Sequence, residues 1–163
     1  MTKIIMFLIL LTGVFYLRAD AQKKYAYAIL NMRCGNEQPH RDRLYFSPII
    51  ELNTLNFPKY TEGIDPAIPI YSVRYYNYAL LKWFELFIKQ YYNIQVTDPE
   101  KYERKFTSVL FNEKNSLSCN DQKTNIDCFF TDKNELAARR DKAIKETKLL
   151  VTQNQICEVV SLD

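Results

Sequence analysis

Apolar side chains recur every three to four positions over residues 72–92, and this is the strongest periodic pattern in the chain. Such spacing is typical of an amphipathic helix, and Ser72 stands where a helix N-cap is favoured. The positions expected to face inward are Val73, Tyr76, Leu80, Trp83, Phe84, Phe87 and Tyr91. The pattern therefore predicts a helix whose wide aromatic face packs against a sheet.

A second helix is predicted over residues 132–148, with a much thinner apolar side. Asp132 and Glu135 have the spacing of a capping box, in which two side chains bond backbone N–H groups at the start of a helix. Oppositely charged side chains four residues apart support the rest of this helix. Its apolar positions are Leu136, Ala143 and Ile144. We expect this helix at the surface, with one narrow stripe facing inward.

Alternation with period two predicts strands before, between and after the two helices. Over residues 23–31 both sets of alternate positions are fairly apolar. Residues 43–52 contain Pro48, which cannot donate a ladder hydrogen bond and so indicates an edge strand or a bulge. Further strands are expected over residues 104–111, 126–130 and 155–162. Residues 53–69 show no sustained period and form the longest irregular segment, which is often where function lies.

The predicted order of elements is β-β-α-β-β-α-β, which favours an α+β fold. We expect a small mixed or antiparallel sheet of about five strands carrying two helices on one face. Residues 22–163 have the size and composition of a single domain tied by disulfides.

The first residues have the three parts of a signal peptide. Lys3 gives a positive start, residues 4–17 are an apolar run, and Ala19-Asp20-Ala21 supplies the small residues of a cleavage site. Residues 1–21 are therefore a predicted signal peptide, and the exported chain would begin at Gln22 in a periplasmic or extracellular space. An uncleaved N-terminal anchor is the alternative. No later stretch reaches the ~18 apolar residues of a span, so no transmembrane segment is expected after residue 21.

The four cysteines are Cys34, Cys119, Cys128 and Cys157. An even number of cysteines in an exported chain predicts two disulfides. Three pairings are open, and we favour Cys119 with Cys128 as a short loop tie and Cys34 with Cys157 as a long one. A zinc site is less favoured because no two cysteines have the spacing of structural ligands and the chain has one histidine. No metal or cofactor is expected.

Charge and composition exclude several classes of function. Removing residues 1–21 leaves 20 basic and 18 acidic side chains, which gives no electrostatic footprint for nucleic acid. The three glycines are too few for a dinucleotide fingerprint or a phosphate loop, and no Gly-x-Ser-x-Gly sequence occurs. The one histidine, His40, has no identifiable catalytic partner and is more simply a loop residue.

Paired carboxylates can hydrolyse glycosidic bonds without a histidine. The acids nearest the aromatic-rich half of the chain are Glu51, Glu62, Asp65 and Glu85. A small secreted hydrolase acting on cell-wall glycan is therefore the alternative functional hypothesis.

The aromatic residues favour binding over catalysis. The helix over residues 72–92 and its flank carry more rings than one face can bury, and Tyr and Trp often anchor partners. Tyr75, Tyr78 and Tyr92 lie off the inward stripe and are the expected binding surface, although a stripe of rings is also ordinary core. The leading hypothesis is an exported, non-catalytic binding domain. It would serve as an envelope accessory subunit or an immunity-type inhibitor, with a protein or an envelope glycan as its partner.

Overall fold

The computed structural model describes residues 22–34, 41–70, 72–94, 105–111 and 129–163. The predicted signal peptide, His40, Cys119 and Cys128 lie outside these ranges. The strands are β1 (Tyr25–Arg33), β2 (Asp42–Phe46), β3 (Ile50–Glu51), β4 (Lys105–Val109) and β5 (Ile156–Ser161). The helices are the 3-10 turn η1 (Leu52–Thr54), α2 (Phe57–Tyr60), α3 (Val73–Tyr92) and α4 (Lys133–Thr152). Two long helices thus accompany five strands in an α+β arrangement, as predicted.

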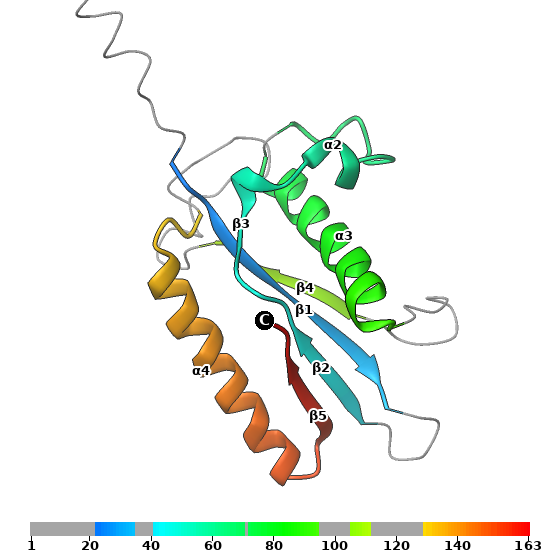
Figure 1. The fold of residues 1–163 in the computed structure, drawn as a ribbon, viewed down its shortest axis with the longest axis vertical. Helices are drawn as coiled ribbons and strands as arrows, with labels where there is room; N and C mark the ends of the chain where they lie inside the picture. The colour runs from blue at the N-terminus through cyan, green and yellow to red at the C-terminus, as the bar shows by residue number, and fades with distance from the viewer. Residues whose placement is uncertain (1–21, 35–40, 71, 95–104, 112–128) are drawn as a thin grey trace, which may run out of the picture.

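The five strands form one mixed sheet around β1 (Figure 1). β1 pairs antiparallel with β2, β3 and β4, while β2 pairs parallel with β5. The parallel pair is possible because α4 carries the chain back before β5 begins. The sheet therefore joins the first strand of the described chain to the last through β2.

The predicted strand over residues 43–52 is interrupted at Pro48, as expected for a bulge. Ala28 and Ser47 face each other, since Ser47 donates its N–H to the Ala28 carbonyl at 2.9 Å and its Oγ accepts from the Ala28 N–H at 2.8 Å. Pairing resumes between Ala26 and Ile50. Two residues of this segment therefore lie opposite the single residue Tyr27, which is the definition of a bulge.

The two long helices cover opposite faces of the sheet, which corrects the expectation that both lie on one face. Alternate residues of β1 belong to different core clusters: Ala28 and Leu30 pack with α3, and Tyr27 packs with α4. Figure 1 shows the strands running between α3 and α4. The physical reason lies in β1 itself, because both of its faces are apolar and each needs a cover.

Side chains cap both long helices at their predicted starts. The Ser72 Oγ accepts a hydrogen bond from the Tyr75 N–H at 3.2 Å, and Asp132 accepts from the N–H groups of Asn134 and Glu135. α3 ends at Asn93, whose left-handed φ of 51° stops the helix. α4 continues to Thr152, beyond the predicted end near residue 148.

The predicted strand over residues 126–130 is described only at its end. Phe129 and Phe130 form isolated antiparallel bridges, with Phe111 and Tyr25 respectively. Both rings are buried, Phe129 on the α3 side of the sheet and Phe130 on the α4 side. This pair of residues therefore contributes to both cores at once.

A disulfide joins Cys34, just after β1, to Cys157 in β5. Their Cα atoms are 6.6 Å apart and their positions in the chain are 123 residues apart. This is the longer of the two favoured pairings. The bridge ties the first and last strands of the described chain at one end of the sheet.

Candidate functional site

An aromatic row runs along one side of α3, formed by Trp83, Phe87 and Tyr91 at four-residue spacing. The ring centroids of Trp83 and Phe87 are 5.1 Å apart with planes 28° from parallel, and those of Phe87 and Tyr91 are 5.0 Å apart. Residues four apart on a helix lie one above the other, so the three rings make a continuous surface. Trp83 and Phe87 are half-buried against the core, whereas Tyr91 is 67% exposed.

This aromatic row forms one wall of a groove against α2. The groove has a volume of about 400 Å³. Its lining residues are Lys59, Tyr60, Trp83, Leu86, Phe87, Gln90 and Tyr91. Tyr60 comes from the irregular segment over residues 53–69, and the Lys59 ammonium lies 5.6 Å from the centre of its ring. The segment without a period and the aromatic helix, two separate features of the sequence, therefore meet at one surface, named here the α2–α3 groove.

Of the three predicted surface tyrosines, one lies beside this groove. Tyr92 is 40% exposed, with its ring centroid 5.8 Å from that of Phe87. Tyr78 is half-buried, on a turn of α3 that does not line the groove. Tyr75 is only 8% exposed, so its prediction as a surface residue was wrong. The cause is a wider buried arc at the start of α3, where Tyr75, Tyr76 and Ala79 are all covered.

The helical spacing predicts that Tyr91 faces inward, and its exposure corrects that expectation. The spacing from Phe87 to Tyr91 is right for one helix face, but the core ends first. Ile88 is the last buried residue of α3, and every residue of the helix after it is exposed. A pattern of spacing cannot reveal which turns of a helix its neighbours leave uncovered. The last turn of α3 therefore presents rings to solvent that periodicity alone would bury.

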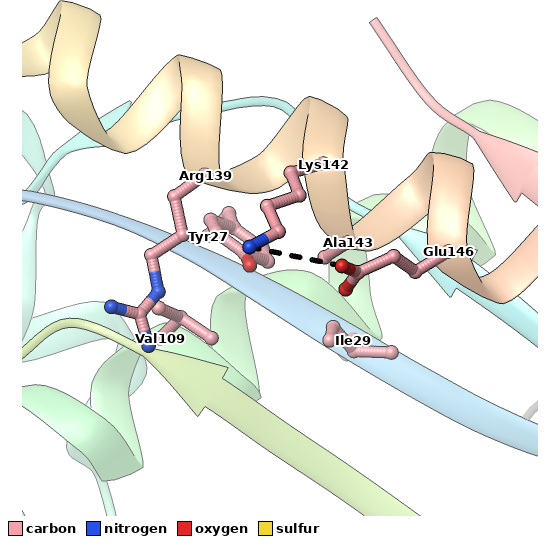
Figure 2. A pocket seen from close by; sticks show the side chains of 7 residues that line it. All are labelled: Tyr27, Ile29, Val109, Arg139, Lys142, Ala143 and Glu146. Atoms are coloured by element: carbon pink, nitrogen blue, oxygen red, sulfur yellow. Dashed lines mark ion pairs between the residues drawn. The ribbon is translucent and has the colours of Figure 1, made fainter.

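A second hollow lies on the opposite face of the sheet, between α4 and the strands β1 and β4, and is named here the α4 pocket. Its volume is about 440 Å³. Its lining residues are Tyr27, Ile29, Val109, Arg139, Lys142, Ala143 and Glu146. Figure 2 shows the charged side chains reaching from α4 over the apolar side chains of the sheet. No feature of the sequence pointed to this pocket, because it depends on where α4 crosses the strands.

None of the acids proposed for glycan hydrolysis lines the α2–α3 groove or the α4 pocket. Glu51 is held by Lys23 at 3.2 Å, and Glu85 lies 3.5 Å from Lys82. Glu62 and Asp65 are exposed. The α2–α3 groove contains no carboxylate and the α4 pocket contains only that of Glu146. Neither site thus offers the two facing carboxyl groups that glycoside hydrolysis requires.

The Lys24 side chain lies partly buried against two aromatic rings of the α3-side core. Its ammonium lies 4.6 Å from the ring centre of Tyr76 and 4.8 Å from that of Phe129, and it donates to the Tyr76 hydroxyl at 3.2 Å. Burial lowers the pKa of Lys24 because the charged form loses hydration. These contacts of Lys24 are with residues of the α3-side core, and Lys24 lines neither the α2–α3 groove nor the α4 pocket.

Within the described residues, no helix combines the length and the apolar character that a membrane span requires. Among the same residues, no three His, Cys, Asp or Glu side chains are grouped so as to hold a metal ion. No protein-family model, curated protein or solved structure matches this chain.

Proposed function

We propose that this protein is an exported, non-catalytic binding domain that holds a protein partner in the α2–α3 groove. The observation that carries the proposal is the exposure of Tyr91 at the end of the Trp83–Phe87 stack. Tyr, Trp and Phe are enriched at protein interfaces, where they supply large rigid contact areas. An exposed ring on a half-buried aromatic base is a suitable anchor for such a contact.

The proposed location in the periplasm or outside the cell is supported by two features. The chain begins with the pattern of a signal peptide, and Cys34 and Cys157 are joined in a disulfide. Structural disulfides persist mainly in oxidising compartments. An accessory subunit of the envelope or an immunity-type inhibitor would both use a small, rigid domain of this kind.

The groove fits a binding function better than a catalytic one. Its polar groups are the Lys59 ammonium, the Gln90 amide and the hydroxyls of Tyr60 and Tyr91, together with the indole N–H of Trp83. These groups can donate hydrogen bonds at the rim of an interface, and none of them belongs to a nucleophile–base pair. A glycan partner would use the same rings, so the experiment must separate the two classes.

The test compares matched truncations of exposed apolar side chains. Tyr91→Ala should leave the urea midpoint nearly unchanged and weaken capture of the partner from the envelope fraction by at least ~1 kcal/mol, as loss of an aromatic anchor does. Leu149→Ala is the control, because Leu149 is also exposed but lies on α4. It should change neither property.

Mass spectrometry of the captured material, with and without protease treatment, tells a protein from a glycan. Protease-sensitive capture that depends on Tyr91 supports the proposal. Capture that is equally strong with Tyr91→Ala would show that the partner binds elsewhere. Capture that depends on Tyr91 but survives protease treatment would indicate that the partner is a glycan and not a protein.

A further inference from the structure

The polar groups that line the α2–α3 groove are mainly hydrogen-bond donors. The indole N–H of Trp83 is a donor only, while the hydroxyls of Tyr60 and Tyr91 both donate and accept. The amide of Gln90 brings two further N–H donors. Within the described residues, none of these four side chains makes a hydrogen bond and no carboxylate lines the groove. A partner that fills the groove must therefore supply hydrogen-bond acceptors.

The length of the aromatic row fits a short extended segment of a partner. At about 1.5 Å per residue, the stretch of α3 from Trp83 to Tyr91 spans about 12 Å. A polyproline II strand rises about 3.1 Å per residue, so about four of its residues match the row. Neighbouring ring centroids in the row are only 5.1 Å and 5.0 Å apart. Apolar side chains along such a strand thus meet an aromatic ring at every step.

The backbone chemistry of the groove distinguishes between three kinds of peptide segment. A docked helix uses its carbonyls in its own hydrogen bonds and offers few acceptors. A docked β-strand needs the open edge of a sheet, whereas this groove lies between the helices α2 and α3. Proline has no N–H, and a polyproline II segment makes no internal hydrogen bonds, so its carbonyls are free to accept. Donors beside a row of rings therefore complement a proline-rich segment best.

Resting on the proposed function, we propose that the α2–α3 groove binds a proline-rich segment of the partner in the polyproline II conformation. Its proline rings pack on Phe87 and Tyr91, and its carbonyls accept hydrogen bonds from the Trp83 indole N–H and the tyrosine hydroxyls. Aromatic-lined grooves recognise such segments because the conformation is formed in advance and loses little entropy on binding.

Trp83 is the only tryptophan of the chain, so its signals report directly on the groove. The probe is a capped nonamer of proline, and a capped Gly-Ser peptide of the same length is the flexible control without rings. Titration of the full mature domain with the proline nonamer should change the Trp83 fluorescence saturably and shift the indole N–H signal in NMR spectra. The Gly-Ser peptide should bind at least about tenfold more weakly, since it is not preorganised. Equal affinity for the two peptides would overturn the proposal.

A substitution in the groove provides the second readout. Tyr91→Ala should weaken binding of the proline nonamer about fivefold or more, as truncation of an aromatic anchor does. Leu149→Ala, an exposed position on α4, is the control and should bind the nonamer as the wild type does. The urea midpoint of each variant checks that the fold is intact. Unchanged affinity in Tyr91→Ala would show that the nonamer binds outside the groove and that the proposal is wrong.

Competition with the captured partner separates this inference from the proposed function. An excess of the proline nonamer should release the partner from the wild-type domain, and the Gly-Ser peptide should not. Partner capture that depends on Tyr91 but resists the nonamer would overturn the polyproline II segment and leave the proposed function in place. Partner capture that is independent of Tyr91 would overturn the proposed function, and this inference with it.

Discussion

The Arg140 side chain of α4 donates a 2.7 Å hydrogen bond from its Nε to the backbone carbonyl of Ser47. This bond joins α4 to the bulge between β2 and β3. The same guanidinium donates to the carbonyl of Leu162 and to the Ser161 hydroxyl, both at 3.0 Å, and lies 3.7 Å from Asp163. Arg140 is only 7% exposed, so one buried cation fastens α4, the bulge and the end of β5 together.

Replacing Arg140 by methionine keeps most of the side-chain volume and removes every donor. The carbonyls of Ser47 and Leu162 then lose their buried partner, which costs about 1–3 kcal/mol for each group left unsatisfied. Urea unfolding measures the loss. Lys145→Met on the exposed side of α4 is the control and should stay within ~0.5 kcal/mol of the wild type. A loss no larger than that of the control would mean that these carbonyls find other donors.

Phe84 is fully buried at the centre of the core between α3 and the sheet. Phe84→Ala should therefore lower the free energy of unfolding by about 3–5 kcal/mol, since the change removes apolar contacts and leaves a cavity. Lys82→Ala, on the exposed side of the same helix, removes only a surface ion pair with Glu85 and should cost little. Denaturant titration of both variants makes the comparison, and similar losses for the two would contradict the helical phase described here.

Opening the disulfide between Cys34 and Cys157 should destabilise the domain by about 2–5 kcal/mol. The reason is that a bridge across 123 residues restricts a large loop of the unfolded chain. Urea unfolding of a variant with both Cys34 and Cys157 changed to serine, without reductant, measures this loss in the free energy of unfolding. Non-reducing peptide mapping should also recover Cys119 linked to Cys128. Detection of free thiols in the folded, unreduced protein would exclude that second bridge.

Burial lowers the pKa of Lys24 below the value of 10.5 for a lysine in water. In the pH window between the lowered pKa of Lys24 in the folded protein and its pKa in the unfolded chain, the unfolded chain binds more protons than the folded one. The free energy of unfolding should therefore rise with pH across that window. NMR titration of the Lys24 side chain should give a midpoint below 10.5. In Lys24→Met the alkaline rise in stability should be smaller, and an identical rise in both proteins would assign it to another group.

Export should remove residues 1–21, because a small-x-small site follows the apolar run. Mass spectrometry of the protein recovered from the periplasm or medium should identify Gln22 as its first residue. A product that still contains Met1 or Lys3 would indicate the uncleaved anchor instead.

Local patterns predicted most of the fold. The start of α3 at Ser72 and the start of α4 at Asp132 follow from capping chemistry, which acts within a few residues. The bulge at Pro48 follows from the missing N–H of proline. The two apolar faces of β1 also encode the placement of the helices on opposite faces of the sheet, whereas the order of elements does not indicate it. The need to cover each apolar face of a strand determines where the helices pack, and the order of elements along the chain does not.

Features that depend on contacts between distant residues were not predictable in this way. Arg140 lies in line with Leu136 and Ile144 on the inner side of α4, which explains why the apolar stripe of this helix looked thin. An arginine in a helix is normally expected to be exposed. Arg140 is buried because groups of the bulge and of the end of β5 accept hydrogen bonds from its guanidinium.

The candidate site was predictable in part. An excess of rings around α3 indicated an aromatic surface, and Tyr92 belongs to it. The burial of Tyr75 and the exposure of Tyr91 depend on where neighbouring segments cover the helix and where they stop. The α4 pocket has no sequence signal of its own, since its floor comes from β1 and β4 and its wall from α4.

Because β5 follows α4 in the chain, the β2–β5 pair of the sheet can form only late in synthesis. A ribosome releases β1 and β2 long before β5, so one edge of β2 has no partner while α4 is still being made. An unpaired strand edge is a template for pairing with other chains. At ~5–20 residues per second, this interval lasts several seconds for the stretch from β2 to β5. The nascent protein therefore exposes this edge of β2 until β5 is made and pairs with it.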